Sequence, residues 1–294
     1  MFGFDCYSPR EIAERVENVG VSKAELPLVS LLALGVLAGG FIGLGGVYFT
    51  LVMSDAGLGF AASRVLGGVV FSLGLILVVV AGAELFTGNN LLLMACVSRR
   101  ITMGRLARNL SLAYAANFVG AAGLAALVAL SGHAKMNHGA VGETAVAVAA
   151  AKCALPFGEA FFKAVLANLL VCLAVWISMA GRTVVDKAVA IIFPVSAFVA
   201  CGFEHCIANM YLIPLGILLR ESFPGASPHL DALHWSGFIA NLVPTTLGNL
   251  VGGAGMVGLV YWLIYRRGAN SRERKSPTEH GHAPSGSMPS RSED

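Results

Sequence analysis

Two copies of one short pattern place an acidic side chain inside an apolar run of the sequence. The pattern is G-x-E-x-x-x-x-N, and it occurs at residues 82–89 and again at residues 202–209. A carboxylate at membrane depth is costly and is by default a candidate for a functional role. Two such carboxylates, Glu84 and Glu204, at matching positions predict an internal repeat with two broken helices, which is the plan of a solute pathway.

The two carboxylates have two candidate roles. As functional groups, Glu84 and Glu204 would transfer protons or coordinate a cation. As structural groups, each would accept hydrogen bonds from the backbone N–H groups that its own broken helix leaves free, since an unmet donor in lipid costs several kcal/mol. The repetition favours the structural role, because a transported species does not need the same acid twice. Asn89 and Asn209 are expected to tie each break together, and Asn209 also to border the pathway.

The two copies differ at two positions that suit a pathway. Where the second copy has His205, the first has Leu85, and where the first has Thr87, the second has Ile207. A neutral imidazole donates from one nitrogen, and its protonated form attracts an anion. A threonine hydroxyl on the facing loop can donate a further hydrogen bond. We therefore expect His205 and Thr87 to lie in the pathway.

The composition of this chain indicates an integral membrane protein. Of its 294 residues, 56% are hydrophobic and only 13% are charged, whereas soluble domains carry roughly 25% charged residues. Six apolar stretches are long enough to cross a bilayer, which takes about 20 residues. They are residues 28–53, 65–97, 107–130, 161–180, 188–219 and 238–265. The second and fifth are longer than a crossing needs and contain the two Glu motifs, so each is expected to be broken by a non-helical loop.

The distribution of basic residues sets the orientation. With both termini inside, most of the 20 lysines and arginines lie on the cytoplasmic side, as the positive-inside rule requires. The outside retains Arg64, Lys135, Lys152, Lys163 and Arg220. The sequence therefore predicts a multi-pass protein of the cytoplasmic (inner) membrane with both termini in the cytoplasm.

Each half of the chain holds three predicted spans, so the second half enters the membrane from the opposite side. The expected architecture is all-α, with two inverted three-helix repeats at about residues 28–131 and 157–265. The sequence at residues 117–120, Asn-Phe-Val-Gly, is echoed by Asn-Leu-Val-Gly at residues 249–252. Inverted repeats of this kind place the site near the middle of the membrane.

The segments outside the spans carry weaker signals. Residues 1–27 lack the apolar core of a signal peptide and read as a cytoplasmic amphipathic segment, which starts well at Ser8 and Pro9. Residues 266–294 are polar and expected to be disordered. None of the six cysteines is spaced as a metal or redox pair, and no metal, cofactor or nucleic-acid partner is expected. Lys152 is either a snorkelling lysine or a group that attracts an anion.

Three stretches of the sequence together resemble the formate–nitrite transporter family. They are residues 84–89 (Glu-Leu-Phe-Thr-Gly-Asn), residues 167–176 and residues 202–210, and the likeness extends from about residue 8 to 265. The resemblance implies an aquaporin-like protomer in a homopentamer, each protomer with its own pore for a small monovalent anion such as formate, nitrite or hydrosulfide. Formate is the expected substrate, and a proton shared with His205 would let a neutral acid cross.

The resemblance also implies roles for single residues. It matches His205 and Thr87 to the central pair of the family, Lys152 to an outer lysine and Asn168 to a pore asparagine. The implied outer constriction consists of Phe71, Leu75 and Phe198, and the implied inner constriction of Leu85, Phe86, Val171 and Ala208. Ala208 is smaller than the bulky residue that some members carry there.

Two other classes of function were weighed. An intramembrane enzyme would use His205 and Glu204 as an acid–base pair, but the sequence has neither G-x-S-x-G nor H-E-x-x-H. A pore for neutral solutes would need a fixed charge near its constriction, and the paired Asn-Pro-Ala signature of aquaporins is absent. Transport of a small anion is the function that the sequence favours.

Overall fold

The computed structural model describes residues 6–267, and these residues are helical with no strand among them. The longer helices are α1 (Pro9–Ala24), α2 (Leu28–Met53), α3 (Phe60–Ile76), α6 (Met103–Leu130), α7 (Ala140–Cys153), α8 (Phe157–Ser178), α9 (Val184–Ala200), α10 (Cys206–Leu219) and α11 (Trp235–Leu250). Short helices α4 (Phe86–Asn89), α5 (Leu93–Val97) and α12 (Val260–Tyr265) complete the α-helical elements.

Two π-helices and several 3₁₀ turns join these helices. The π-helix Leu77–Gly82 (η1) extends α3, and the π-helix Val251–Leu259 (η7) joins α11 to α12 into one continuous rod. The 3₁₀ turns are Asn90–Leu92 (η2), His133–Lys135 (η3), Asn137–Gly139 (η4), Arg220–Ser222 (η5) and Leu230–Ala232 (η6). A π-helix of this length is unusual and often adjoins a functional site; η7 packs against α8 and η2.

Five helical rods are long and apolar enough to cross a membrane within the described residues. They are Leu28–Met53, Phe60–Gly82, Met103–Leu130, Phe157–Ser178 and Trp235–Tyr265. The fifth stretch expected from the sequence, residues 188–219, is broken as predicted and forms α9 and α10, of 17 and 14 residues. Neither is long enough alone, because each residue of an α-helix advances only about 1.5 Å.

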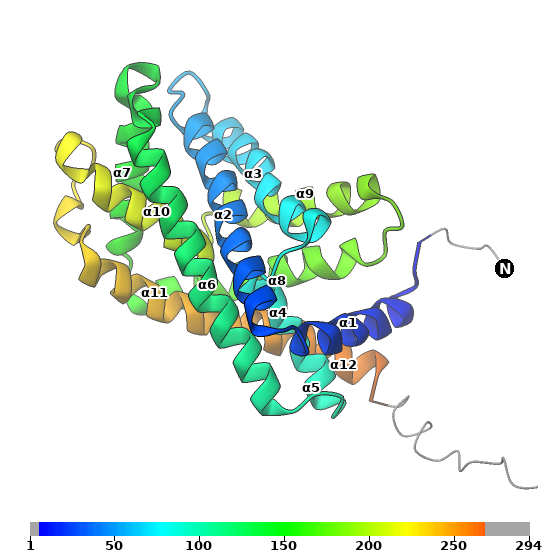
Figure 1. Cartoon of the computed structure of the whole chain (residues 1–294). Coiled ribbons are helices and arrows are strands. Elements are labelled where there is room, and N and C mark those ends of the chain that lie inside the picture. Colours follow the sequence, from blue (N-terminus) through cyan, green and yellow to red (C-terminus); the bar gives the residue numbers. More distant parts are fainter. Residues whose placement is uncertain (1–5, 268–294) are drawn as a thin grey trace, which may run out of the picture.

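The helices form two bundles that pack against each other (Figure 1). Helix α2 lies along α6 and α3, and α8 lies along α11 and α9. Close approach in the two bundles uses equivalent glycines. A Cβ on Gly120 would lie 1.9 Å from the carbonyl oxygen of Val36, and one on Gly252 would lie 2.1 Å from that of Val165. These glycines end the repeated Asn-x-x-Gly sequences, so the echo in the sequence marks two equivalent helix crossings.

Helix α1 lies at the same end of the fold as α5 and α12, where Figure 1 places it across the helix ends. Ser8 and Glu11 form a capping box at its start, and the bonds from Ser8 hold the pKa of the Glu11 carboxyl below its usual range. The buried carboxylate of Glu17 binds Arg266 at 3.1 Å. The expected amphipathic segment is thus a docked helix. Residues 1–5 and 268–294, and with them most of the expected tail, lie outside the described residues.

Helix α7 was not expected from the sequence, which placed residues 140–153 in a connection between the repeats. It begins after the turns η3 and η4, and it packs against α10 at the end of the fold away from α5 (Figure 1). Helix α7 precedes α8 as α1 precedes α2.

Candidate functional site: two broken helices and the path between them

The chain leaves helical geometry at both G-x-E-x-x-x-x-N sequences. After η1, Gly82 takes a φ of 83°, and α4 begins only at Phe86. After α9, Gly202 takes a φ of 70°, and α10 begins at Cys206. Positive φ is a left-handed conformation that glycine adopts without steric cost, which explains why both sequences begin with a glycine. In each copy the acid lies in the extended segment between two helices.

The amide of Asn117, on α6, satisfies the backbone of the first break. Its Oδ1 accepts the N–H of Phe86 at 2.9 Å. Its Nδ2 donates to the carbonyl of Glu84 at 2.9 Å and to that of Gly35 at 2.8 Å. One buried side chain thereby ties the broken segment to α2 and α6.

Asn249, on α11, does the same at the second break. Its Oδ1 accepts the N–H of Cys206 at 2.9 Å, and its Nδ2 donates to the carbonyls of Glu204 at 3.0 Å and Ala164 at 2.8 Å. From the sequence, we expected the carboxylates of Glu84 and Glu204 to accept hydrogen bonds from the backbone N–H groups that the breaks leave free. The hydrogen bonds correct that expectation, because an amide can both donate and accept and so satisfies donors and acceptors together.

The carboxylate of Glu84 instead belongs to a cluster of one partly exposed and three buried side chains, which we call the inner cluster: Lys23, and Glu84, Asn89 and Asn109. Lys23 Nζ lies 2.9 Å from Glu84 Oε1 and donates to Asn89 Oδ1 at 2.9 Å. Asn89 Nδ2 donates to Glu84 Oε2 at 2.7 Å and to Asn109 Oδ1 at 2.8 Å. Asn109 Nδ2 closes the cluster on the carbonyl of Lys23 at 3.0 Å.

Glu204 belongs to a matching outer cluster: Glu204, Lys152, Asn209 and Asn241. Lys152 Nζ lies 2.7 Å from Glu204 Oε1. Asn209 Nδ2 donates to Glu204 Oε2 at 2.6 Å and to Asn241 Oδ1 at 2.7 Å, and Asn241 Nδ2 donates to the carbonyl of Lys152 at 2.9 Å. One bond has no equivalent here, since Oδ1 of Asn209 is buried without a partner.

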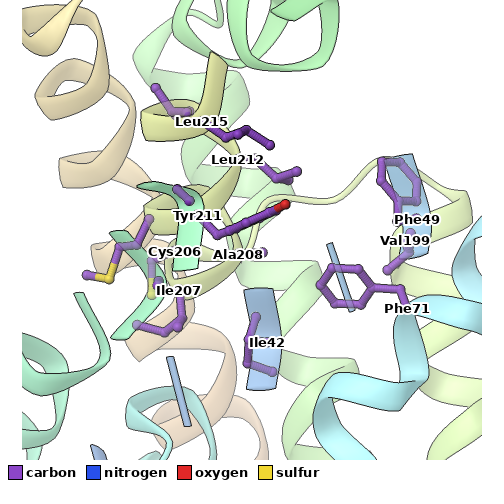
Figure 2. Close-up of a cluster of buried hydrophobic side chains, with 14 of the residues drawn as sticks. Ile42, Phe49, Phe71, Val199, Cys206, Ile207, Ala208, Tyr211, Leu212 and Leu215 are labelled. Carbon is purple, nitrogen blue, oxygen red and sulfur yellow. The ribbon is translucent and has the colours of Figure 1, made fainter. Parts of the chain in front are cut away.

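Three cavities lie in series between the two clusters. The inner cavity, of about 660 Å³, is lined by residues that include Lys23, Glu84 and Asn89. The outer cavity, of about 320 Å³, is lined by residues that include Lys152 and Glu204. A central cavity of about 10 Å³ shares walls with both. Figure 2 shows rings from α2 and α3 lying across from α10, and several of these side chains line the outer cavity.

The lining of the cavities tests how the predicted constrictions are arranged. Phe71 and Phe198, with rings 6.0 Å apart, line both the outer and the central cavity. Leu75, expected with them, lines the central and inner cavities together with Leu85. Val171 lines the central cavity.

Two side chains expected at the inner constriction lie elsewhere. Ala208, in the first turn of α10, lines the outer cavity. Phe86 lines none of the three cavities and packs against Tyr114, with ring centroids 4.9 Å apart.

His205 is the polar side chain of the central cavity, and it also lines the outer cavity. Its Nε2 lies 2.9 Å from Thr87 Oγ1, across the two broken helices. Its Nδ1 accepts the backbone N–H of Ala208 at 3.0 Å and so caps the start of α10. Its ring stacks on Phe198 at 5.9 Å. The structure thus brings together His205 and Thr87, each of which has an apolar residue as its counterpart in the other copy, and both are buried.

Three donors converge on the carbonyl oxygen of Thr87. Asn168 Nδ2 lies 3.3 Å away, Cys172 Sγ 3.3 Å and Asn90 Nδ2 3.0 Å. Asn168 also donates to the carbonyl of Asn249 at 2.7 Å. Asn168 lines none of the three cavities, and neither does Thr87; through its bond to the carbonyl of Thr87, Asn168 holds the loop that carries that residue. Asn209 likewise acts within the outer cluster and lines none of them.

Comparison with known proteins identifies the family. A family model described as formate/nitrite transporter matches residues 10–263. The chain belongs to the formate/nitrite transporter family. It is 41% identical over 276 residues to the formate channel FocA of Escherichia coli K12, an alignment that covers 90% of this chain and 96% of FocA. It is also 41% identical over 265 residues to FocA of Haemophilus influenzae, with 86% and 92% covered.

Solved structures of the formate/nitrite transporter family agree with this fold. A pentameric formate channel with formate bound is 38% identical, with a TM-score of 0.74, and the match covers 81% of this chain and 97% of that one. A second structure, an ion channel of the same family, is 29% identical with a TM-score of 0.76. The chain is therefore a membrane transporter of this family and not an enzyme, which removes the acid–base alternative for His205 and Glu204. Within residues 6–267 no group of three metal-binding side chains occurs.

Proposed function

We propose that this chain conducts formate across the cytoplasmic membrane, through one path in each protomer that runs along the three cavities. The observation that carries the proposal is the pair of His205 and Thr87. His205 is the polar side chain among those that line the central cavity, and its Nε2 lies 2.9 Å from the hydroxyl oxygen of Thr87, which itself lines none of the three cavities. A dehydrated anion at that point needs hydrogen-bond donors, because burying an uncompensated charge is very costly.

The outer cavity is suited to collect an anion. Arg64, Lys152 and Lys163 line it, against the single carboxylate of Glu204. A cleft with an excess of one charge raises the local concentration of ions of the other sign. The small central cavity, of about 10 Å³, has room for no more than about one water, so this narrow point of the path disfavours carboxylates larger than formate.

We propose an inverted arrangement of the two repeats in the membrane. Residues 9–130 and 140–265 contain helices in the same order, and the inner and outer clusters repeat the same bonds except the one from the lysine to the asparagine Oδ1. In this arrangement α9 and α10 together complete a sixth crossing, the protomer is aquaporin-like, and both termini are cytoplasmic. The positive-inside distribution supports this orientation.

We also propose a homopentamer. The support is the related formate channel that is described as pentameric, together with large apolar side chains exposed on the outer faces of α2, α3 and α9. Native mass spectrometry in mild detergent should give five copies. A stable monomer or dimer would contradict the proposed assembly without bearing on the path inside each protomer.

Flux into proteoliposomes tests the function. We expect uptake of labelled formate well above that of empty liposomes, and none of glycerol. Uptake of nitrite or hydrosulfide, but not formate, would keep the path and replace the substrate. Glycerol uptake at the rate of formate would overturn the proposal in favour of a pore for neutral solutes.

A further inference from the structure

Tyr211, on α10, is a buried side chain whose hydroxyl belongs to neither of the two clusters. The residue is 0% exposed, and among residues 6–267 its hydroxyl oxygen has no hydrogen-bond partner. Burying a hydroxyl without a hydrogen bond costs free energy, whereas a phenyl ring in the same place would carry no such cost. A tyrosine at this position therefore points to a group that reaches the hydroxyl from the path.

Two glycines of α2 hold the ring of Tyr211 beside the path. A Cβ on Gly43 would lie 3.1 Å from Cδ2 of the ring, and a Cβ on Gly46 would lie 2.7 Å from its Cδ1 and Cε1. Ile42, which precedes the first glycine, lines the central cavity, and Phe49, which follows the second by one turn, lines the outer cavity. The ring therefore packs on α2 at the level between these two cavities.

The hydroxyl end of the ring points toward aromatic side chains of the path. Figure 2 shows the oxygen of Tyr211 directed from α10 toward the side where Phe49 and Phe71 lie, and both of these rings line the outer cavity. On α10 itself, Ala208 and Leu212 line the same cavity. Tyr211 lines none of the three cavities, so its hydroxyl lies behind this wall and is covered by it.

The first copy of the repeat has an apolar residue at the equivalent position. Leu91 stands nine residues after Gly82, as Tyr211 stands nine residues after Gly202. Leu91 lines the inner cavity, which supports a place for its counterpart beside the outer cavity. A polar side chain in one copy and an apolar one in the other is also the contrast that marks His205.

We infer that the hydroxyl of Tyr211 is a hydrogen-bond donor to formate at the outer constriction, between the outer and the central cavity. The rings of Phe71 and Phe198 are 6.0 Å apart, and the central cavity beyond them has a volume of about 10 Å³, so a solute passes when these side chains move. The same movement uncovers the hydroxyl, which donates to an oxygen of the anion and replaces a water that the anion has lost. The inference rests on the proposed function for the identity of the anion.

The hydroxyl of Tyr211 should lower the barrier to passage rather than strengthen binding in the outer cavity. It is covered while formate occupies that cavity, so its hydrogen bond to formate belongs to the passage itself. An interaction that forms only at the barrier raises the maximal rate and leaves the half-saturating concentration nearly unchanged. A residue that only shaped the fold would not separate these two quantities.

A matched pair of variants in proteoliposomes tests the inference. Tyr211→Phe keeps the ring between the two glycines and removes only the unpartnered hydroxyl, so its melting temperature should equal that of the parent or exceed it. Its maximal rate of formate uptake should fall at least about tenfold, the effect of one hydrogen bond to a charged group. Tyr114→Phe is the control, because the Tyr114 hydroxyl has a partner in Thr246 at 2.8 Å and Tyr114 lines none of the three cavities. It should lower the melting temperature and leave uptake per folded protein unchanged.

The outcomes separate this inference from the proposed function. Equal maximal rates for Tyr211→Phe and the parent would overturn the inference and leave formate conduction standing. A lower melting temperature for Tyr211→Phe would also overturn it, because the hydroxyl would then have a partner within the protein. If the parent takes up nitrite but no formate, and Tyr211→Phe slows that uptake, the donor role stands and the proposed substrate is wrong. A parent that takes up neither anion would overturn both.

Discussion

Lys152 Nζ lies 2.7 Å from Oε1 of Glu204, with side-chain exposures of 16% and 4%. Lys152 is therefore half of a mostly buried ion pair that holds the break before α10. The pair at the inner cavity, Lys23 and Glu84, has the same geometry at 2.9 Å. Each lysine retains donors that its carboxylate does not use, so one side chain can brace a broken helix and attract an anion.

Removal of the ion pair between Lys152 and Glu204 should lower the stability of the protein more than it lowers formate uptake. We expect Lys152→Met to destabilise the protein by about 3–5 kcal/mol, because it leaves the carboxylate of Glu204 buried without its partner charge. Lys152→Met combined with Glu204→Gln should recover most of the loss, since no uncompensated charge remains. Thermal unfolding in detergent measures both. A single variant as stable as the parent would show that Glu204 does not depend on Lys152.

The asparagine side chains that bind the backbone at the two breaks should contribute as much to the stability of the protein as the two glutamates do. Asn249→Ala leaves the N–H of Cys206 and the carbonyls of Glu204 and Ala164 without their partner. Each unsatisfied buried group costs about 1–3 kcal/mol, so a large drop in melting temperature is expected. Asn137→Ala is the control, because its bond to the carbonyl of Ser54 lies in a partly buried connection. Equal melting temperatures for the two variants would contradict the bracing role.

Thr87 should be replaceable by serine but not by valine. Thr87→Ser keeps the hydroxyl that contacts His205 at 2.9 Å, whereas Thr87→Val keeps the shape and removes the donor. We expect formate uptake to fall at least tenfold in Thr87→Val, because one hydrogen bond to a charged group contributes about 1.5–3 kcal/mol, and about 1.4 kcal/mol at the barrier is already a factor of ten in rate. Thr87→Ser should stay within a few-fold of the parent. Unchanged uptake by Thr87→Val would remove Thr87 from the path.

Substitutions of His205 should separate its cap from its place in the path. Asparagine is a strong helix cap and keeps a donor, so His205→Asn should fold as the parent does and pass anions with weaker dependence on external pH. His205→Phe lacks both the cap and the donor, and should lose about 1 kcal/mol of stability and close the path. Labelled formate uptake against pH is the measurement. A pH profile of His205→Asn identical to that of the parent would place the pH response elsewhere.

The proposed orientation predicts opposite labelling of two exposed positions. In a chain whose exposed cysteines have been replaced, Lys135→Cys should react with an impermeant thiol reagent from outside. Glu14→Cys, on α1, should react only from the cytoplasmic side. Both native side chains are exposed. The reverse pattern would contradict the inverted arrangement, although not the membership of the family.

The sequence predicted the broken helices because their signals are local. Glycine, acid and asparagine recur at fixed spacing, and the contrasts of His205 with Leu85 and of Thr87 with Ile207 pointed to the residues that meet. The partners of the acids were missed, since Lys23 and Asn109 are far from Glu84 in the chain and only folding brings them together. The sequence did contain a signal for the side chains that bind the backbone at the two breaks, because Asn117 and Asn249 begin the two similar Asn-x-x-Gly sequences. Their amides were not assigned to the freed backbone groups.

The sequence carries less information about the constrictions than about the polar pair of His205 and Thr87. Leu75, Phe86 and Ala208 are apolar residues in apolar segments, so neither composition nor spacing tells which cavity each one borders. Helix α7 was not predicted from the sequence for a similar reason. Its sequence, rich in alanine and valine, is too short to cross a bilayer and has no strong amphipathic pattern. Only its contact with α10, which brings Lys152 to Glu204, gives it a role.

Each of the two clusters is complete within its own half of the chain. Lys23, Glu84, Asn89 and Asn109 precede residue 131, and Lys152, Glu204, Asn209 and Asn241 follow residue 139. Among the described bonds of these clusters, none crosses from one half to the other. Each half thus carries the means to stabilise its own broken helix, as an ancestral single-repeat protein would have to. Thr87 and His205 lie outside the two clusters and meet across the halves, although His205 also caps α10 in its own half. The two copies could diverge at these positions after a duplication while the clusters around them stayed the same.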